Sequence, residues 1–411
     1  MVVHSGMPTA VGNASISGIV SEALNHPEIV EIYGGLNGMP GVLNEELIDL
    51  AEESQQNIRG LRHTPGAALG SSRMSLRHEQ DFERMFQVLR AHDIRFLFEI
   101  GDHECLAGAQ RLHELAVERG YDLRVVVVPK SMDNEIAGTD HCPGFGSAIK
   151  HLSTTVRAVS ADLASLSRRD SVAFIETPGR AGGWLTAGAT MAKSRERIMD
   201  DPPHLVYLPE VPFSVEKLFA DIDYVLKKER FCIVALSEGL RDLDGNYLTE
   251  GSITETLGRP LIGSAGELLR HLTEEQMNLN ASCVRLGSAS RAAVHCASQA
   301  DNEEAFRAGS AAVRAAVEGK SGKMITLIRG DGDSYTCETG LADLAELAQK
   351  IKSVPENWIN EDGFSMTFQF YKYCLPLIQG EVELPYDNGS PRFIELNRAR
   401  VQRQLQGYEM A

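Results

Sequence analysis

The sequence lacks the features of membrane, secreted and disulfide-rich proteins. No stretch approaches the roughly 20 consecutive apolar residues that a membrane-spanning helix needs. The N-terminus lacks the basic and apolar regions of a signal peptide, so we expect a cytoplasmic protein with no membrane partner. The seven cysteines include no CxxC pair. An odd, dispersed set argues against a disulfide framework and against a zinc cage.

Positive charge is also scarce. The chain has 40 Lys and Arg against 57 Asp and Glu, a net charge of −17. Nucleic acid binding needs a basic face, so we expect no nucleic-acid partner. Because remote charges are screened over about 8–10 Å at cellular salt, a local cluster of Arg and Lys could still bind a small polyanion.

What is present is the pattern of an α/β protein. With 411 residues, 43% of them hydrophobic, the chain is long enough for two domains. Continuous apolar runs alternate with segments of helical spacing, such as that of Phe82, Met85, Phe86 and Leu89. This alternation predicts parallel sheets covered on both faces, with sites at the carboxyl ends of the strands. The expected strands are 95–100, 123–129, 172–176, 205–210, 231–237 and 324–329.

Two glycine-containing segments could bind phosphate. Residues 5–13 form a turn that leads into a helical pattern, and a helix N-terminus offers free N–H groups to an anion. Residues 69–73 form a small-residue turn ending at Arg73, whose guanidinium could bind a phosphate through two hydrogen bonds. A plain tight turn and a surface arginine are the alternatives that the local sequence leaves open.

Acidic residues follow the expected strand 95–100. Gly101, Asp102, His103 and Glu104 stand at its end. Carboxylates at a strand end suit Mg²⁺, which takes a few of them together with waters and phosphate oxygens. The alternative is a helix N-terminus, where acidic residues are favourable.

The segment 129–135 is the most informative. It places Lys130, Ser131, Asp133 and Glu135 together after the expected strand 123–129. Phosphoryl transfer to an alcohol needs a carboxylate near the attacking hydroxyl and positive charge on the transferring group. Asp133 and Lys130 could supply these. A solvated polar loop is the alternative.

Three later segments carry residues suited to a sugar phosphate. Arg180 and Arg291 could hold its phosphate, and Glu210 could accept hydrogen bonds from sugar hydroxyls. Each could instead form an ion pair within its own loop.

Ten segments, in order along the chain, resemble those of the phosphofructokinase family and of its pyrophosphate-dependent branch in particular. They are HSGMPTAVGNAS, RHTPGAALGSSR, PKSMDNE, TDHCPGFGSAIK, TPGRAGGWLTA, LPEVPF, SEG, LGSASR, WINEDGF and PLIQGE. The resemblance implies two phosphofructokinase-like domains, each a largely parallel sheet flanked by helices, with the active site in the cleft between them. It implies a donor-phosphate domain over 1–150, a sugar-phosphate domain over 151–345 and C-terminal helices and tail over 346–411, with the chain crossing between domains. A homodimer or homotetramer is also implied.

The resemblance further implies an activity and its residues. A phosphoryl group would pass from pyrophosphate to the C1 hydroxyl of fructose 6-phosphate, with Mg²⁺ as cofactor. Asp133 would be the base, and Lys130 and Ser131 would be further catalytic residues. The donor phosphates would lie along Gly6, Arg73, Gly101, Glu104 and Lys130. The sugar phosphate would bind Ser131, Asp133, Glu135, Gly179, Arg180, Glu210 and Arg291.

Donor choice rests on two positions. ATP-using members of the family carry glycines where Glu104 and Lys130 stand, whereas pyrophosphate users carry an acid and a lysine. A carboxylate beside an ATP phosphate would also repel it. Both points favour pyrophosphate.

The chain departs from the family pattern at several site positions. Met7 and Asp102 replace glycines, and His103 replaces an Asp, Asn or Gly, which makes Asp102 the expected metal ligand. Pro178 and Ser288 are also unusual, and they favour a second hypothesis, transfer to another sugar phosphate such as sedoheptulose 7-phosphate. Met7 and Asp102 favour a third, a sugar-phosphate-binding homologue without catalysis.

Overall fold

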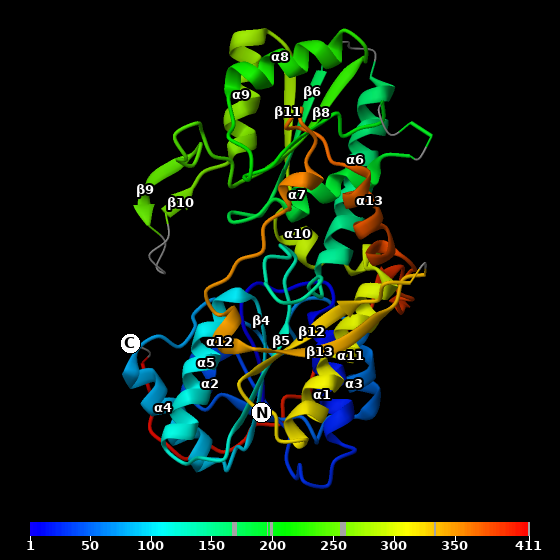
Figure 1. The fold of residues 1–411 in the computed structure, drawn as a ribbon. Coiled ribbons are helices and arrows are strands. Elements are labelled where there is room, and N and C mark those ends of the chain that lie inside the picture. The colour runs from blue at the N-terminus through cyan, green and yellow to red at the C-terminus, as the bar shows by residue number, and fades with distance from the viewer. Residues whose placement is uncertain (167–170, 195, 198–199, 255–259, 333, 410–411) are drawn as a thin grey trace.

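A computed structural model describes residues 1–166, 171–194, 196–197, 200–254, 260–332 and 334–409. These residues form two α/β halves, drawn one below the other in Figure 1. Each half is built on its own sheet, with helices on both faces of that sheet. The predicted architecture, two α/β domains that are each built on a largely parallel sheet flanked by helices, is confirmed.

The lower half contains a seven-stranded sheet. Its inner five strands run parallel, and the two edge strands run antiparallel to their neighbours. In spatial order the strands are β13 (Cys337–Asp343), β12 (Lys323–Arg329), β5 (Arg124–Pro129), β4 (Phe96–Gly101), β1 (Val2–His4), β2 (Tyr33–Gly35) and β3 (Leu47–Asp49). Its helices are α1 (Gly12–Ala23), α2 (Gly38–Leu43), α3 (Gln55–Gly60), α4 (Glu79–Ala91), α5 (His103–Glu118), α11 (Gln299–Val317) and α12 (Leu344–Leu347).

Strand β5 explains why the sequence shows a continuous apolar run here. Val125 and Val127 pack into the core beneath α4 and α5, whereas Val126 and Val128 pack into the core beneath α1 and α11. Successive side chains of a strand point to opposite faces, so a sheet covered on both faces needs apolar residues at every position.

The upper half contains a four-stranded sheet, parallel throughout, with apolar cores on both faces. In spatial order its strands are β11 (Asn280–Arg285), β6 (Ser171–Thr177), β8 (Phe231–Ser237) and β7 (Leu205–Tyr207). The helices are α6 (Phe145–Ser165), α7 (Trp184–Gly188), α8 (Val215–Leu226), α9 (Ala265–Met277), α10 (Ser288–Arg291) and α13 (Phe368–Cys374).

Short elements complete the described chain. Two hairpins pair β9 (Glu250–Thr254) with β10 (Pro260–Ile262) and β14 (Tyr386–Asp387) with β15 (Ser390–Pro391). The 3₁₀ turns are η1 (Leu61–His63), η2 (Ala189–Ala192), η3 (Val294–Cys296), η4 (Glu356–Trp358) and η5 (Leu375–Ile378).

Six strands were expected from apolar runs, and five match within one or two residues at each end. The sixth, 205–210, ends at Tyr207 instead, shortly before Pro209, which has no N–H to donate to a sheet. The edge strands β11 and β13 were missed because their residues are mostly half-buried or exposed, so they carry no continuous apolar run.

The predicted segment 151–345 does not stay in the upper half. Its last part, α11, β12 and β13, belongs to the lower half, so the chain returns there earlier than the predicted boundary. Helix α11 packs closely on α1: a Cβ at Gly18 would lie 2.1 Å from the carbonyl oxygen of Phe306, and one at Gly309 would lie 2.2 Å from that of Ser15. Only glycine allows the two backbones this approach.

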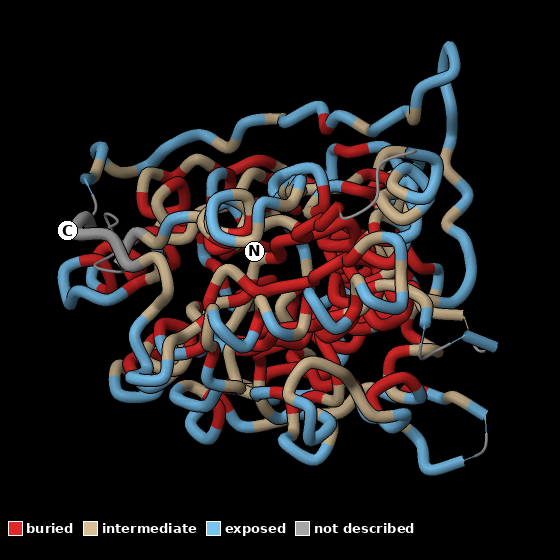
Figure 2. The backbone as a smooth tube through the Cα atoms, turned by 90° about the horizontal axis from the view of Figure 1, so that it is seen from above, coloured by how far each residue is buried: buried red, intermediate tan, exposed pale blue. Residues whose placement is uncertain are grey.

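Viewed from above, the buried backbone gathers in the middle of the molecule and the exposed backbone forms its rim (Figure 2). Among the helices of the described residues, none has both the length and the apolar composition to cross a membrane.

Candidate active site

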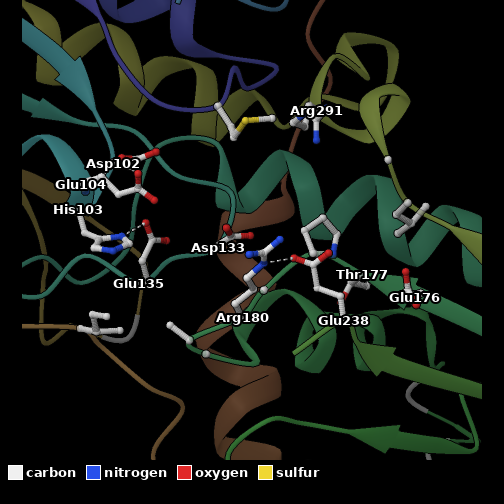
Figure 3. A pocket seen from close by; sticks show the side chains of 18 of the residues that line it. Asp102, His103, Glu104, Asp133, Glu135, Glu176, Thr177, Arg180, Glu238 and Arg291 are labelled. Atoms are coloured by element: carbon white, nitrogen blue, oxygen red, sulfur yellow. Dashed lines mark hydrogen bonds and ion pairs between the residues drawn. The ribbon is translucent and has the colours of Figure 1, made fainter. Parts of the chain in front are cut away.

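A cavity of about 720 Å³ lies where strand ends of the two halves face each other. From the lower half, residues after β4 and β5 line it, among them Asp102, Glu104 and Asp133. From the upper half, residues after β6, β8 and β11 line it, among them Arg180 and Glu238. Figure 3 shows these side chains converging from both halves. The rule that sites form at the carboxyl ends of parallel strands therefore located the cavity.

The lining is rich in charge of both signs. Its arginines are Arg73, Arg180, Arg285 and Arg291. Its carboxylates are Asp102, Glu104, Asp133, Glu135, Glu176 and Glu238. The cluster of arginines that a polyanionic ligand requires is thus present, although the whole chain is strongly acidic.

Gly6 lies against the carboxylate of Asp102. Its φ of +75° is one that side-chain-bearing residues rarely adopt, and a Cβ there would lie 2.0 Å from Asp102 Oδ2. Its N–H donates a hydrogen bond to the carbonyl of Ser72 at 2.8 Å. This bond joins residues 5–13, which we call the first phosphate loop, to the turn before Arg73. Met7, next in the chain, lines the cavity. The two predicted donor loops are therefore in contact.

Asp102 caps the N-terminus of α5. Its Oδ1 accepts a hydrogen bond from the N–H of Glu104 at 3.2 Å. Gly101 does not line the cavity but makes room for this turn, because a Cβ there would lie 2.5 Å from Cys105 Sγ. Of the two alternatives for this segment, the helix N-terminus is present, with Asp102 as its cap, whereas the Mg²⁺ site stays a prediction.

Asp133 is one of the carboxylates that line the cavity. Its Oδ1 is buried and has no hydrogen-bond partner among the described residues. Burial, the nearby charge of Glu135 and, less strongly, those of Glu238 and Asp102 raise the pKa of Asp133. A carboxylate with spare acceptor capacity and a raised pKa is suited to take up a proton.

Glu135 is paired where Asp133 is not. Its Oε1 lies 3.1 Å from Nδ1 of His103 (Figure 3). Its Oε2 accepts a hydrogen bond from the Ser131 hydroxyl. Burial alone would raise the pKa of Glu135, but its bonds to His103 and Ser131 lower it. The Ser131 hydroxyl also accepts the N–H of Asp133 at 3.1 Å, so it holds the loop in shape.

Lys130 does not line the cavity. Its side chain is fully buried, and its ammonium donates a hydrogen bond to the carbonyl of Met7. Burial lowers the pKa of Lys130. The expectation that Lys130 lies directly along the donor phosphates is therefore corrected for this structure, because the lysine supports the first phosphate loop from beneath.

On the acceptor side, Gly179, Arg180 and Arg291 line the cavity as expected, but Glu210 does not. Its carboxylate accepts hydrogen bonds from the N–H groups of Gly183 and Val354, each at 2.9 Å from Oε1. The expected contact with sugar hydroxyls is corrected on this point, because Glu210 lies outside the cavity lining and its carboxylate is bonded to these backbone groups.

Two acidic residues of the cavity were not predicted. Glu238 pairs with Arg180, with 3.4 Å between Oε1 and Nε (Figure 3), and Glu176 pairs with Arg285 at 3.0 Å. Both strand ends were visible in the sequence: Glu238 stands in the SEG segment after β8, and Glu176 lies near the end of β6. The pairings join different strands and could not be read from either segment.

The lining residues fit a divalent cation. Two phosphorylated ligands would add several negative charges to a cavity that already holds six carboxylates and four guanidinium groups. Mg²⁺ commonly binds one or two carboxylates and completes its shell with waters and phosphate oxygens. Asp102 is a lining carboxylate of the type that such a cation binds, and its Oδ2 lies against Gly6. Within the described residues, the acids of the cavity form no closed three-ligand cage.

The chain is similar to known proteins along its whole length. Residues 1–316 match the family model described as Phosphofructokinase. The chain is 36% identical to the pyrophosphate--fructose 6-phosphate 1-phosphotransferase of Halomonas elongata, over 99% of this chain and 98% of that protein. It is 34% identical to the protein of the same name from Methylococcus capsulatus, over 98% and 96%. A pyrophosphate-dependent phosphofructokinase from Marinobacter aquaeolei superposes with a TM-score of 0.89 at 34% identity, covering 100% of this chain and 99% of that one.

Proposed function

Because the chain belongs to the phosphofructokinase family, we propose that it transfers a phosphoryl group from pyrophosphate to the C1 hydroxyl of fructose 6-phosphate. The observation that carries the proposal is the position of Asp133. Its carboxylate, whose buried Oδ1 has no hydrogen-bond partner in the described part of the chain, lies at the junction between the donor loops of the lower half and the arginines of the upper half. Relatives named for this reaction match the chain almost from end to end.

In the proposed reaction, Asp133 takes the proton of the C1 hydroxyl. The hydroxyl oxygen then attacks the near phosphorus of pyrophosphate, the bridging P–O bond breaks, and inorganic phosphate leaves. Ser131 and Glu135 keep the Asp133 loop in shape. Arg180 and Arg291 bind the phosphate of the sugar, beside Gly179, whose φ of +133° lets the backbone turn there.

On the donor side, Arg73 and the N–H groups near Gly6 bind pyrophosphate. Mg²⁺, held by Asp102, would neutralise phosphate charge when bound. The buried ammonium of Lys130 donates to the Met7 carbonyl, so it adds positive charge beneath the loop of residues 5–13 without contacting the phosphates itself. Glu104 lines the cavity, where its carboxylate repels and crowds the remainder of a nucleotide. This arrangement supports pyrophosphate rather than ATP as the donor.

The experiment is a donor comparison. The full-length protein is incubated with Mg²⁺ and fructose 6-phosphate, and with either pyrophosphate or ATP. We expect fructose 1,6-bisphosphate and phosphate only with pyrophosphate. Turnover with ATP alone would refute the donor assignment, and binding of both substrates without turnover would leave a binding protein.

The proposal extends to the protein's setting. We propose a cytoplasmic homodimer or homotetramer, as the family resemblance implies. Sedimentation at assay concentration tests the assembly, and a monomeric, fully active protein would contradict it.

A further inference from the structure

The chain after α12 crosses from the lower half to the upper half. It then reaches η4, where the ring of Trp358 packs against that of Trp184 in α7, with 6.0 Å between their centroids. We call residues 351–354 the strap. Ile351 forms an isolated β-bridge with Ile136 and lines the cavity, and the N–H of Lys352 donates to the carbonyl of Glu135 at 2.8 Å. The strap is therefore bonded to the same loop that carries Asp133.

The side chain of Lys352 strengthens this attachment. Its ammonium donates to Asn134 Oδ1 at 3.1 Å and to the carbonyls of Thr139 and Asp140 at 3.2 and 2.8 Å. An ammonium has three N–H donors, and here three acceptors take them. The acceptors come from both ends of the segment 134–140, so one side chain ties its ends together.

Asn134 is the most constrained residue of that segment. It is fully buried, and its φ of +55° is unusual for a residue with a side chain. Its side chain accepts the N–H of Cys142 at 3.0 Å and donates to the hydroxyl of Tyr373 at 3.0 Å. Such a backbone conformation persists only where the surroundings hold it. Because Asn134 follows Asp133 directly, its backbone conformation helps to fix the course of the chain next to the proposed base.

The other side of the strap is bonded to the upper half. The carbonyl of Lys352 accepts the indole N–H of Trp184 at 2.8 Å, and the N–H of Val354 donates to Glu210 at 2.9 Å. Glu210 also accepts the N–H of Gly183, which together with Trp184 follows the loop of Gly179 and Arg180. One short segment thus bonds to the loop of the proposed base and to the loop that binds the sugar phosphate.

We propose that Lys352 is a positioning residue, which holds the loop of Asp133 at a fixed place relative to the sugar-phosphate loop 179–183. This inference rests on the proposed function for its kinetic consequence, but its structural part does not. Two loops from different halves must meet one substrate, and a displacement of about 1 Å can cost a hundredfold in rate. The strap supplies the connection that fixes them.

The test is the full-length Lys352→Met variant, with Lys350→Met as the matched control. Lys350 lies two residues earlier and is exposed. We expect Lys352→Met to lower kcat at least tenfold with KM for both substrates within about twofold, because binding groups remain while the base is misplaced. We expect hydrogen exchange of residues 133–142 to become faster in Lys352→Met and to stay unchanged in Lys350→Met.

The two readouts separate this inference from the proposed function. Unchanged exchange of 133–142 in a folded Lys352→Met variant overturns it, whether or not the wild type turns over pyrophosphate. Faster exchange with unchanged kcat also overturns it. If the wild type shows no turnover, the proposed function is refuted. The hydrogen-exchange measurement then tests by itself whether Lys352 holds the loop of Asp133 in place.

If Lys352→Met does not fold, Tyr373→Phe carries the same test. The Tyr373 hydroxyl accepts from Asn134 and donates to the carbonyl of Asp140 at 2.7 Å, so its removal loosens the same segment without removing a charge. Tyr371→Phe on the same helix is its control. We expect Tyr373→Phe to lower kcat and speed exchange of 133–142, and no change in either would overturn the inference.

Discussion

The buried ammonium of Lys130 donates a hydrogen bond to the carbonyl of Met7, and this bond joins the loop of the proposed base to the first phosphate loop. Met7 follows β1 and Lys130 follows β5, and β4 lies between these two parallel strands, so the bond reaches across the end of β4. The predictions below follow from this arrangement.

Lys130→Met should weaken use of the donor more than use of the acceptor. It removes the positive charge beneath the phosphate loop and leaves the Met7 carbonyl without its partner. Removing one charged or donor group of a phosphate site typically costs about 10²–10³ in rate. Steady-state kinetics should show kcat/KM for pyrophosphate falling by about this factor, with Lys350→Met unaffected. A normal kcat/KM for pyrophosphate would contradict a donor-side role.

Asp133→Asn should abolish chemistry without abolishing binding. The amide keeps the size of the side chain but cannot take the hydroxyl proton, and a general base typically contributes about 10²–10⁴ in rate. We expect kcat to fall by that factor while calorimetry still detects fructose 6-phosphate. Asp122→Asn, an exposed substitution, is the control. Retention of most activity by Asp133→Asn would exclude Asp133 as the base.

The pH dependence of kcat/KM should reflect the raised pKa of Asp133. The pKa is raised because burial disfavours the charged carboxylate, and because Glu135, Glu238 and Asp102 place negative charge nearby. Asp133 must be ionised to act, so activity is present above its pKa and is lost as the pH falls through it. The acid limb of the profile, where activity falls as the pH is lowered, should therefore have its midpoint well above the pKa of about 4 of an ordinary aspartate.

A variant without the negative charge of Glu238 tests whether that charge raises the pH at which activity is lost. Glu238→Gln keeps a group that can accept from Arg180 but removes one negative charge near Asp133. The acid limb should move to lower pH. A limb that stays in place would show that Glu238 does not influence the titrating group.

Removal of Mg²⁺ should stop turnover, and Asp102 should set the concentration of Mg²⁺ required. With EDTA present we expect no product, and excess Mg²⁺ should restore the rate. Asp102→Asn retains an oxygen that can accept the N–H of Glu104 but lowers the charge at the metal. We expect a higher half-saturating Mg²⁺ concentration with nearly unchanged maximal rate. An unchanged Mg²⁺ requirement would exclude Asp102 as a ligand.

The sequence by itself determined the fold class and the location of the site. The run Val125–Val128 is apolar at every position because both faces of its sheet are covered, and that pattern is local. Chemically distinctive residues at strand ends, such as Asp133 in the lower half and Arg180 in the upper half, also line one cavity, because the carboxyl ends of the strands in both sheets face it. Local periodicity and spacing carry this information.

Only the tertiary structure decided what each charged side chain bonds to. The ammonium of Lys130 donates to the Met7 carbonyl. Glu210 accepts the N–H of Val354, which lies 144 positions away in the sequence. The role of Lys352 was likewise invisible, since its three acceptors lie more than 200 positions earlier in the chain. A side chain in a loop takes the partner that packing of distant segments brings to it, and no local pattern specifies that partner.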